Sequence, residues 1–327
     1  MGNGVVGIPG LLDEVRGACQ QVAERAAHVR IVSDGIAAYA ALLSLEVIAR
    51  PEHDAASHYL GQGAGTVAFF LTLDSINFGS GYFPHLRKRP GMSGYFSVAS
   101  SLNDHFRAHG PLSAQQLVDL TVQECTRIFG QDADNAPIAE LMRHFAAALH
   151  DLGYYVGQRF DGSFLRLVEA ANGSAERLVH LLIEMPYFRD IEPYGDLQVA
   201  FFKRAQLSAA DLAIAFDGHG PGHFNDLHRL TIFADNLVPH VLRMDGVLGY
   251  APMLAATIDR EGLIPAGSAE EVEIRACALH AVELLAAELR RSGHDVSPMQ
   301  LDYLLWNRGQ QPRYKAHPRH RTRTVFY

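Results

Sequence analysis

One lysine stands beside an apolar helical stripe, where its ammonium group could take part in chemistry. Apolar side chains recur at helical spacing through residues 201–216, and Lys203 lies about 100° of rotation away from that stripe. Gln206 lies one turn above Lys203 on the predicted helix. Such a lysine either extends its ammonium group to water, which is the commoner outcome, or projects it into a cleft beside Gln206.

A carboxylate occupies a similar position in a second apolar segment. Residues 227–243 show another helical stripe, with Asp235 at its edge. Pro239 lacks an N–H group, so we expect the helix to kink or end near Asp235. A carboxylate in apolar surroundings costs free energy unless it is paired, which makes Asp235 a candidate for function. A half-exposed aspartate at a helix end is the simpler interpretation of the spacing.

A third segment has the composition of a pocket wall. Residues 73–84 combine short polar side chains, aromatic rings and glycines directly after a buried apolar run. Asp74 and Asn77 offer a carboxylate and an amide that could hydrogen-bond a base edge, and Phe78 offers a ring for stacking. An aromatic-rich turn that closes the core fits the same composition equally well.

At these residues the chain resembles the queuosine salvage protein family, the queuosine 5′-phosphate N-glycosylases. The resemblance lies in five blocks: FFKRAQLSAADL (201–212), TIFADNLVPH (231–240), LDSINFGSGYFP (73–84), LDYLLWNRG (301–309) and PRHRTRTVFY (318–327). Two departures are Asn236, where the family pattern has an aromatic residue, and the many glycines after Asn77. The blocks span most of the chain, which indicates a full-length relative.

The resemblance implies a reaction and the residues that perform it. The expected enzyme hydrolyses the N-glycosidic bond of queuosine 5′-monophosphate and releases the base queuine for salvage, a step linked to tRNA modification. Asp235 would stabilise the positive charge that develops on the ribose, and Lys203 would orient and balance that carboxylate. Queuine is a 7-deazaguanine without an N7 to protonate, so the site must stabilise the departing base elsewhere. Neither a cofactor nor a metal is implied.

The same resemblance suggests where the substrate is held. Phe78 and Trp306, the only tryptophan, are candidates for stacking on the base, while Asp74 and Asn77 would read its edge. Further candidate binding residues are His53, Gln206, Asn236 and Asp302. For the 5′-phosphate we name the alternating arginines of the basic tail, Arg319, Arg321 and Arg323, which would lie on a strand with one face docked. A solvated tail is the commoner state of such a run.

The elements expected to position these residues are mainly helices. Ser268 and Glu271 form a predicted capping box for a helix over residues 269–291. Other helices are expected at residues 35–49, from Ser113 to Gly130, and at 137–152 before Gly153. Residues 67–73 fit a buried strand or a core helix, and residues 87–97 and 158–164 could supply a small sheet.

These elements predict the class of fold and its organisation. We expect a mostly α protein with at most a small β element, similar through the family to the helix-hairpin-helix DNA glycosylases. Residues 1–327 would form a single unit, with room for two helical lobes that flank a central cleft. The sequence does not indicate an oligomeric state.

Composition excludes several classes of partner. The net charge is −8 without a dense basic stripe, which disfavours a polynucleotide and favours a small-molecule substrate. No apolar run is long enough for a membrane span and no signal peptide is recognisable, so a cytoplasmic location is expected. The glycines of residues 2–7 spell a dinucleotide-binding motif but lack the strand that must precede it. Residues 217–226 contain metal-ligand residue types, but their spacing matches no known zinc or iron site. The alternative function is a non-catalytic carrier or sensor of queuosine derivatives.

Overall fold

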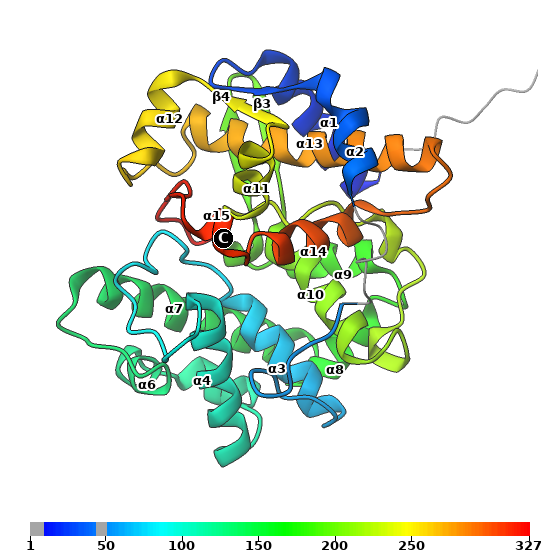
Figure 1. Cartoon of the computed structure of the whole chain (residues 1–327). Coiled ribbons are helices and arrows are strands. Elements are labelled where there is room, and N and C mark those ends of the chain that lie inside the picture. Colours follow the sequence, from blue (N-terminus) through cyan, green and yellow to red (C-terminus); the bar gives the residue numbers. More distant parts are fainter. Residues whose placement is uncertain (1–9, 44–50) are drawn as a thin grey trace, which may run out of the picture.

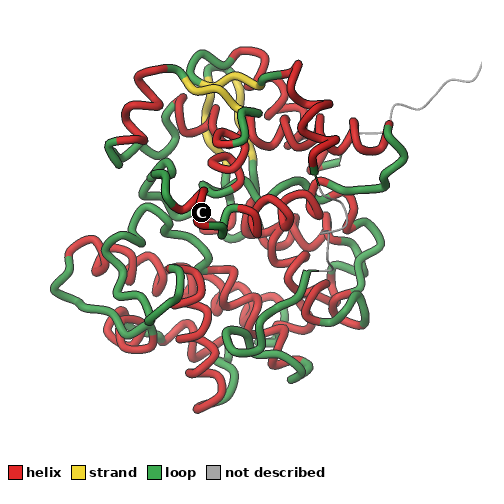
Figure 2. The backbone as a smooth tube through the Cα atoms, in the orientation of Figure 1, coloured by secondary structure: helices red, strands yellow, loops and turns green. Residues whose placement is uncertain are grey.

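The helices of the computed structural model form two groups, with the C-terminus between them (Figure 1). The structure describes residues 10–43 and 51–327, and this part of the chain is mostly helical, as predicted. The tube view shows that strands occupy only a small area within one group (Figure 2). The mostly α prediction is therefore confirmed, while the likeness to helix-hairpin-helix DNA glycosylases stays a prediction.

The first group is built around the long helix α13 (Ala269–Arg291), whose side chains are buried along most of its length. The Ser268 side chain accepts a hydrogen bond from the Glu271 backbone and begins the helix where the sequence predicts. The helices that accompany α13 in this group are α1 (Leu11–Arg25), α2 (Ile36–Leu42), α11 (Val238–Met244) and α12 (Pro252–Asp259). Residues 44–49 of the helix predicted to start at Gly35 lie outside the described residues.

The second group contains the helices between residues 64 and 170. They are α3 (Ala64–Ser75), α4 (Gly94–His109), α5 (Ala114–Asp119), α6 (Val122–Ile128), α7 (Ala136–Arg159) and α8 (Phe164–Ala170). The single helix predicted from Ser113 to Gly130 is wrong. Ser113 begins the first helix with a capping box to Gln116, and Leu120 is extended. Thr121 then forms a second capping box with Glu124, so the chain makes two short helices.

Four further helices connect the groups: α9 (Ala175–Leu182), α10 (Lys203–Ala215), α14 (Pro298–Arg308) and α15 (Pro312–Lys315). Short 3₁₀ turns, among them η3 (Pro186–Phe188) and η5 (Leu227–Arg229), lie in the loops. The helix predicted over residues 227–243 is wrong in its first half. Residues 230–237 are irregular but buried, and Pro239 lies in the first turn of α11, where its missing N–H costs nothing.

The strands form two small antiparallel pairs. One pair joins β1 (Val29–Ile31) to β4 (Leu248–Tyr250), and the other joins β2 (Ile191–Tyr194) to β3 (Leu197–Ala200). The sheet predicted from residues 87–97 and 158–164 is wrong, because these residues form a loop leading into α4 and the end of α7. The ambiguous run 67–73 is the core helix α3, in which every residue from Thr66 to Ser75 is buried.

Helix α7 continues through Gly153, where the sequence predicts its end. A Cβ atom at Gly153 would lie 2.5 Å from the carbonyl oxygen of Ala114 and 2.7 Å from the Leu117 Cβ. The glycine therefore permits close packing of α5 against α7 instead of ending the helix.

Substitution of this glycine tests the close packing directly. Gly153→Ala is expected to lower the free energy of unfolding by about 1–3 kcal/mol, since backbone atoms must move. Gly157 lies one turn further on α7 with open space at its Cβ position. Gly157→Ala should instead be neutral or stabilise by up to about 1 kcal/mol. Denaturant unfolding of both variants measures the difference, and equal effects would contradict the packing argument.

Candidate active site

A cavity of about 730 Å³ lies between the two helical groups, within the size range of small-molecule sites. Its walls come from the loop at residues 51–58, residues 77–96, one face of α10, residues 233–237, helix α14 and the tail at residues 315–327. Segments distant in the sequence thus meet at one place, where the C-terminal tail crosses the centre of Figure 1. Most of the residues predicted to act on a substrate lie on these walls.

Asp235 lines the cavity and is half-buried just before helix α11. Its Oδ1 atom accepts hydrogen bonds from the backbone N–H groups of Leu237 (2.7 Å) and Val238 (3.1 Å). These bonds satisfy donors at the start of α11 and fix the carboxylate in one orientation. The second carboxylate oxygen is thereby left for a ligand.

Lys203 is the first residue of α10 and also lines the cavity. The preceding Phe202 has φ of 50°, a left-handed conformation that a bulky residue seldom adopts. Lys203 Nζ donates a hydrogen bond to the Asn77 carbonyl oxygen at 3.0 Å. Burial lowers the pKa of Lys203, and the opposing influence of the Asp235 charge shows that the two groups interact.

A buried ion pair connects the segments that carry Asp235 and Lys203. Arg275 of α13 is fully buried and binds both carboxylate oxygens of Asp190, at 3.0 and 2.6 Å. Its Nε atom donates to the carbonyl oxygen of Ala234, the residue before Asp235, at 3.0 Å. Asp190 in turn accepts a bond from the Lys203 backbone N–H at 3.4 Å. One arginine therefore fixes the positions of both candidate catalytic residues.

Asp302 of α14 lies on the cavity wall with only 4% of its surface exposed. It accepts a hydrogen bond from the Phe233 backbone N–H at 2.9 Å. Burial, followed by the nearby Asp235 charge, raises the pKa of Asp302 well above its usual range. This carboxyl group therefore favours its protonated form more than an exposed aspartate does.

The structure also places other predicted contacts on the cavity wall: His53, Asn77, Phe78, Asn236 and Trp306. Trp306 has its ring edge-on to both Tyr95 and Phe96. Asn236 Nδ2 donates to the carbonyl oxygen of His320 at 3.3 Å, which ties the segment around Asp235 to the tail. This hydrogen bond explains why a short polar residue, and not an aromatic one, stands at position 236.

Two residues predicted to contact substrate are not among those that line the cavity. Gln206 is fully buried, accepts from the Thr231 backbone N–H and donates to the Thr231 hydroxyl, both at 2.9 Å. It therefore connects α10 to the irregular segment before Asp235. Asp74 is also fully buried, on α3 behind the wall, and neither of its oxygens accepts a hydrogen bond of normal geometry.

The basic tail is docked on the protein, as its alternating pattern predicts, although it forms only one isolated β-bridge, between Arg321 and Leu263. His320, Thr322 and Thr324 are buried, whereas the three arginines between and beside them are partly exposed. Arg319 and Arg321 line the cavity. Arg323 does not, because its guanidinium group lies over the Tyr82 ring, 4.0 Å from Glu140. The prediction of Arg323 at a phosphate site is therefore corrected.

The glycines after Asn77 receive the same tail. A Cβ atom at Gly81 would lie 2.2 Å from the carbonyl oxygen of Thr322, and the Gly79 N–H donates to the Tyr327 carbonyl at 2.9 Å. The unexpected glycine content of this segment is thus explained by close approach of the C-terminal backbone.

Sequence reasoning missed Asp211, which lines the cavity from α10 and is only 3% exposed. The Tyr303 hydroxyl donates to its Oδ1 atom at 3.1 Å, and the His53 ring contacts its backbone oxygen at 3.0 Å. Burial raises the pKa of Asp211 to about 6. Asp211 lies two turns after Lys203 on the same side of the helix, a spacing that the sequence does contain.

Electrostatic interactions connect the charged groups that line the cavity. Asp235 has Lys203, Asp302 and Arg319 among the groups whose pKa it influences. Asp211 interacts with His58, Lys203 and Asp74. Arg319 interacts with Asp235 and Arg321. Asp211 thus interacts with Lys203, Lys203 with Asp235, and Asp235 with Arg319.

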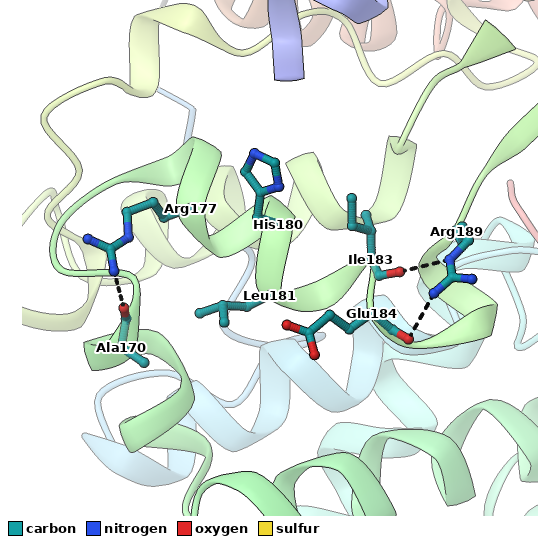
Figure 3. Close-up of a pocket in the computed structure, with 7 residues that line it drawn as sticks. All are labelled: Ala170, Arg177, His180, Leu181, Ile183, Glu184 and Arg189. Carbon is teal, nitrogen blue, oxygen red and sulfur yellow. Dashed lines mark hydrogen bonds between the residues drawn. The ribbon is translucent and has the colours of Figure 1, made fainter. Parts of the chain in front are cut away.

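A second hollow, of about 580 Å³, lies on the surface over α9 and contains none of the predicted site residues. Figure 3 shows Arg177 and Arg189 turned toward backbone carbonyl oxygens of Ala170, Ile183 and Glu184.

Over residues 10–43 and 51–327, no group of three or more His, Cys, Asp or Glu side chains could hold a metal ion. No described helix is long and apolar enough to cross a membrane.

The fold and the cavity define a mostly helical protein with a site suited to a small polar ligand. The family model described as queuosine salvage protein matches residues 57–327. The chain belongs to this family.

Similar proteins extend the match over nearly the whole chain. A protein of Sphaerobacter thermophilus is 36% identical over 313 residues, covering 94% of this chain and 96% of that protein. A Dictyostelium discoideum protein is 33% identical, with 80% and 78% covered, and a Mus musculus protein is 30% identical, with 95% and 98% covered. Each carries the name queuosine 5′-phosphate N-glycosylase/hydrolase.

Proposed function

We propose that this chain hydrolyses the N-glycosidic bond of queuosine 5′-monophosphate and releases queuine. The observation that carries the proposal is the oriented carboxylate of Asp235, which lines the cavity and interacts with the charges of Lys203 and Arg319. The family and the names of its similar members support the same reaction. The cavity wall carries the buried carboxyl groups of Asp211 and Asp302 and the guanidinium group of Arg319, and we propose that the base lies at the acids and the phosphate at the arginine.

Asp235 is proposed to act on the sugar. When the C–N bond breaks, its electrons leave with the base and positive charge develops at the ribose C1′. A fixed carboxylate beside C1′ stabilises that charge, and such preorganised groups contribute about 10²–10³ in rate. Water then adds to C1′ and gives up a proton. Lys203 balances the Asp235 charge and donates a hydrogen bond to the Asn77 carbonyl oxygen in the cavity wall. We therefore propose that Lys203 orients Asp235 and does not attack the ribose as a nucleophile.

The departing base needs a proton because a 7-deazaguanine leaves poorly as an anion. Asp302 is the candidate donor, since it lies on the wall, interacts with Asp235 and has a raised pKa. Its proton would pass to the base as the C–N bond breaks, and the proton lost by the attacking water would restore the acid. Trp306 remains the proposed stacking residue for the base, and Phe78, whose ring is only 2% exposed and packs against the Arg204 guanidinium group, supports the cavity wall.

The 5′-phosphate is proposed to bind at Arg319. This half-buried guanidinium group has no hydrogen bond or ion pair to another described residue, apart from its electrostatic interaction with Asp235. Arg321 also lines the cavity, but it is paired with Glu261 at 2.8 Å. A partly buried cation without a hydrogen-bonded anion suits a phosphate group.

Arg319→Met is therefore expected to raise the KM for queuosine 5′-monophosphate by about 10- to 100-fold, the effect of losing one or two charge-assisted hydrogen bonds. The KM for the nucleoside queuosine, which has no phosphate, should change little. Arg323→Met is the matched control, because Arg323 lies outside the cavity. Steady-state kinetics on both substrates measure this, and an equal rise for nucleotide and nucleoside would contradict phosphate binding at Arg319.

The reaction itself is tested by incubating the protein with queuosine 5′-monophosphate and measuring free queuine by liquid chromatography. Release of queuine at catalytic turnover supports the proposal. Tight binding without release would favour the alternative of a carrier or sensor of queuosine derivatives. A pure binder has no need of a carboxylate fixed beside C1′, which is why we favour the enzyme.

The proposal includes the setting of the reaction. We propose a cytoplasmic enzyme that acts on a mononucleotide from turnover of modified tRNA and needs no polynucleotide, membrane or cofactor. The net charge of −8 supports a small substrate over a nucleic acid chain. We propose one functional unit whose two helical groups flank the substrate cleft, in the manner of DNA glycosylases.

A further inference from the structure

Asp211 of α10 and Tyr303 of α14 form a hydrogen-bonded pair on the side of the cavity that these two helices line. We propose that Asp211 reads the donor edge of the base, accepting hydrogen bonds from its ring N–H and its 2-amino group, and that Tyr303 is a positioning residue that fixes this carboxylate. The proposal rests on the proposed function, because it assumes that the base occupies this side.

Two hydrogen bonds hold Asp211 in place at the cavity wall. Tyr303 from α14 binds Oδ1 at 3.1 Å, and His53 contacts the backbone oxygen at 3.0 Å. The Asp74 carboxyl group also hydrogen-bonds this carboxylate, and Asp211 lines the cavity. A carboxylate only accepts hydrogen bonds, so it suits a guanine-like edge that presents adjacent donors and rejects an edge that lacks them.

Asp74 lies behind Asp211 and interacts with it and with Ser208. Burial, followed by the Asp211 charge, raises the pKa of Asp74 well above its usual range. Two adjacent buried carboxyl groups do not both ionise readily, so the proton stays on Asp74 and the charge on Asp211, which faces the cavity. The protonated Asp74 supports the Asp211 carboxylate from behind without contacting the ligand.

The test is a binding measurement with two free bases, 7-deazaguanine and 7-deazahypoxanthine, which differ only in the 2-amino group. Trp306 is the only tryptophan and lines the cavity, so its fluorescence reports occupancy. Wild type should bind 7-deazaguanine at least about tenfold more tightly, the effect of one hydrogen bond to a charged group. In Asp211→Asn this ratio should fall to about one.

Two further variants separate recognition from folding. Tyr303→Phe should weaken binding of 7-deazaguanine while keeping a preference for it, because the carboxylate remains. Asp104→Asn changes an exposed aspartate on α4 and should leave both affinities unchanged. A preference in Asp211→Asn equal to that of wild type would overturn the proposal. Queuosine 5′-monophosphate cleavage is measured in parallel, so a failure of base reading is distinguished from a failure of the reaction.

The pH dependence of wild-type binding supplies a second test. With the pKa of Asp211 raised to about 6, the ionised acceptor is lost as the pH falls through that value. Affinity for 7-deazaguanine should then fall about tenfold for each further pH unit. An equal fall in affinity in wild type and in Asp211→Asn would overturn the proposal.

The groups around Asp211 do not produce the same change. Burial lowers the pKa of His53 to about 4, so this ring stays neutral while Asp211 titrates, and burial also lowers the pKa of His58. The other facing groups are Asp74 and Asp302, whose pKa values are raised, Tyr95 and Tyr303, which keep their protons, and Lys203. The Asp211→Asn variant should not show the fall in affinity for 7-deazaguanine at low pH. That difference would assign the fall to the Asp211 carboxylate.

Discussion

Asp235→Asn is expected to lower the rate of queuine release by about 10²–10³ or more, because the charge that stabilises the ribose cation is removed. An asparagine carbonyl oxygen can still accept the bonds from the Leu237 and Val238 N–H groups, so the start of α11 should remain intact. Only the negative charge and the free carboxylate oxygen are lost. The change should therefore reduce kcat and leave substrate affinity within about threefold of wild type.

The measurement compares single-turnover rates with affinity from Trp306 fluorescence. Asp259→Asn is the matched control, since that aspartate lies on α12 with 60% of its side chain exposed. The control should cleave at the wild-type rate. If Asp235→Asn also cleaved at the wild-type rate, the chemistry would have to lie elsewhere, with Asp302 as the next candidate. If the variant lost binding as well, Asp235 would be a binding residue.

Arg275→Met should have the largest effect on stability, a loss of about 3–5 kcal/mol in the free energy of unfolding. The substitution leaves the Asp190 and Glu271 carboxylates buried without their cation, Glu271 lying 3.5 Å from Arg275. It also removes the bond to the Ala234 carbonyl and the stacking of the guanidinium group on Phe201. Arg275→Lys should rescue little, because an ammonium group cannot bind both Asp190 oxygens in the same plane.

Denaturant unfolding tests this prediction, with Arg89→Met as the control. Arg89 forms an exposed ion pair with Asp104, so its loss should cost at most about 1 kcal/mol. Because Arg275 fixes the segments before Asp235 and Lys203, any folded Arg275 variant should also have reduced activity. An Arg275→Met protein as stable as the control variant would show that the buried pair contributes nothing.

The sequence singled out Lys203 and Asp235 as the candidate catalytic pair because both residues lie in short, specific blocks. Lys203 and Asp235 each stand beside an apolar stripe, and the family resemblance selected them from many charged residues. The cavity brings them together with Asp302, Trp306 and Asn236, as expected. Helix α13 was predicted to the residue at both ends, because a capping serine begins it and a glycine follows its end closely.

Other features depend on contacts that a single sequence does not reveal. An apolar stripe at helical spacing also occurs in residues 230–237, which are buried without being helical, because neighbouring segments satisfy their backbone. The strands have only three or four residues, too few for an alternating pattern to be read. Asp211 gains its role only when α14 brings Tyr303 against α10.

Single-turnover product analysis of the wild-type protein tests the central claim most directly. Enzyme in excess is mixed with queuosine 5′-monophosphate, and queuine and ribose 5-phosphate are measured together over time. The account predicts that both products appear at the same rate and in equal amounts. A nucleotide that is bound but remains intact would contradict the account and identify the protein as a carrier or sensor.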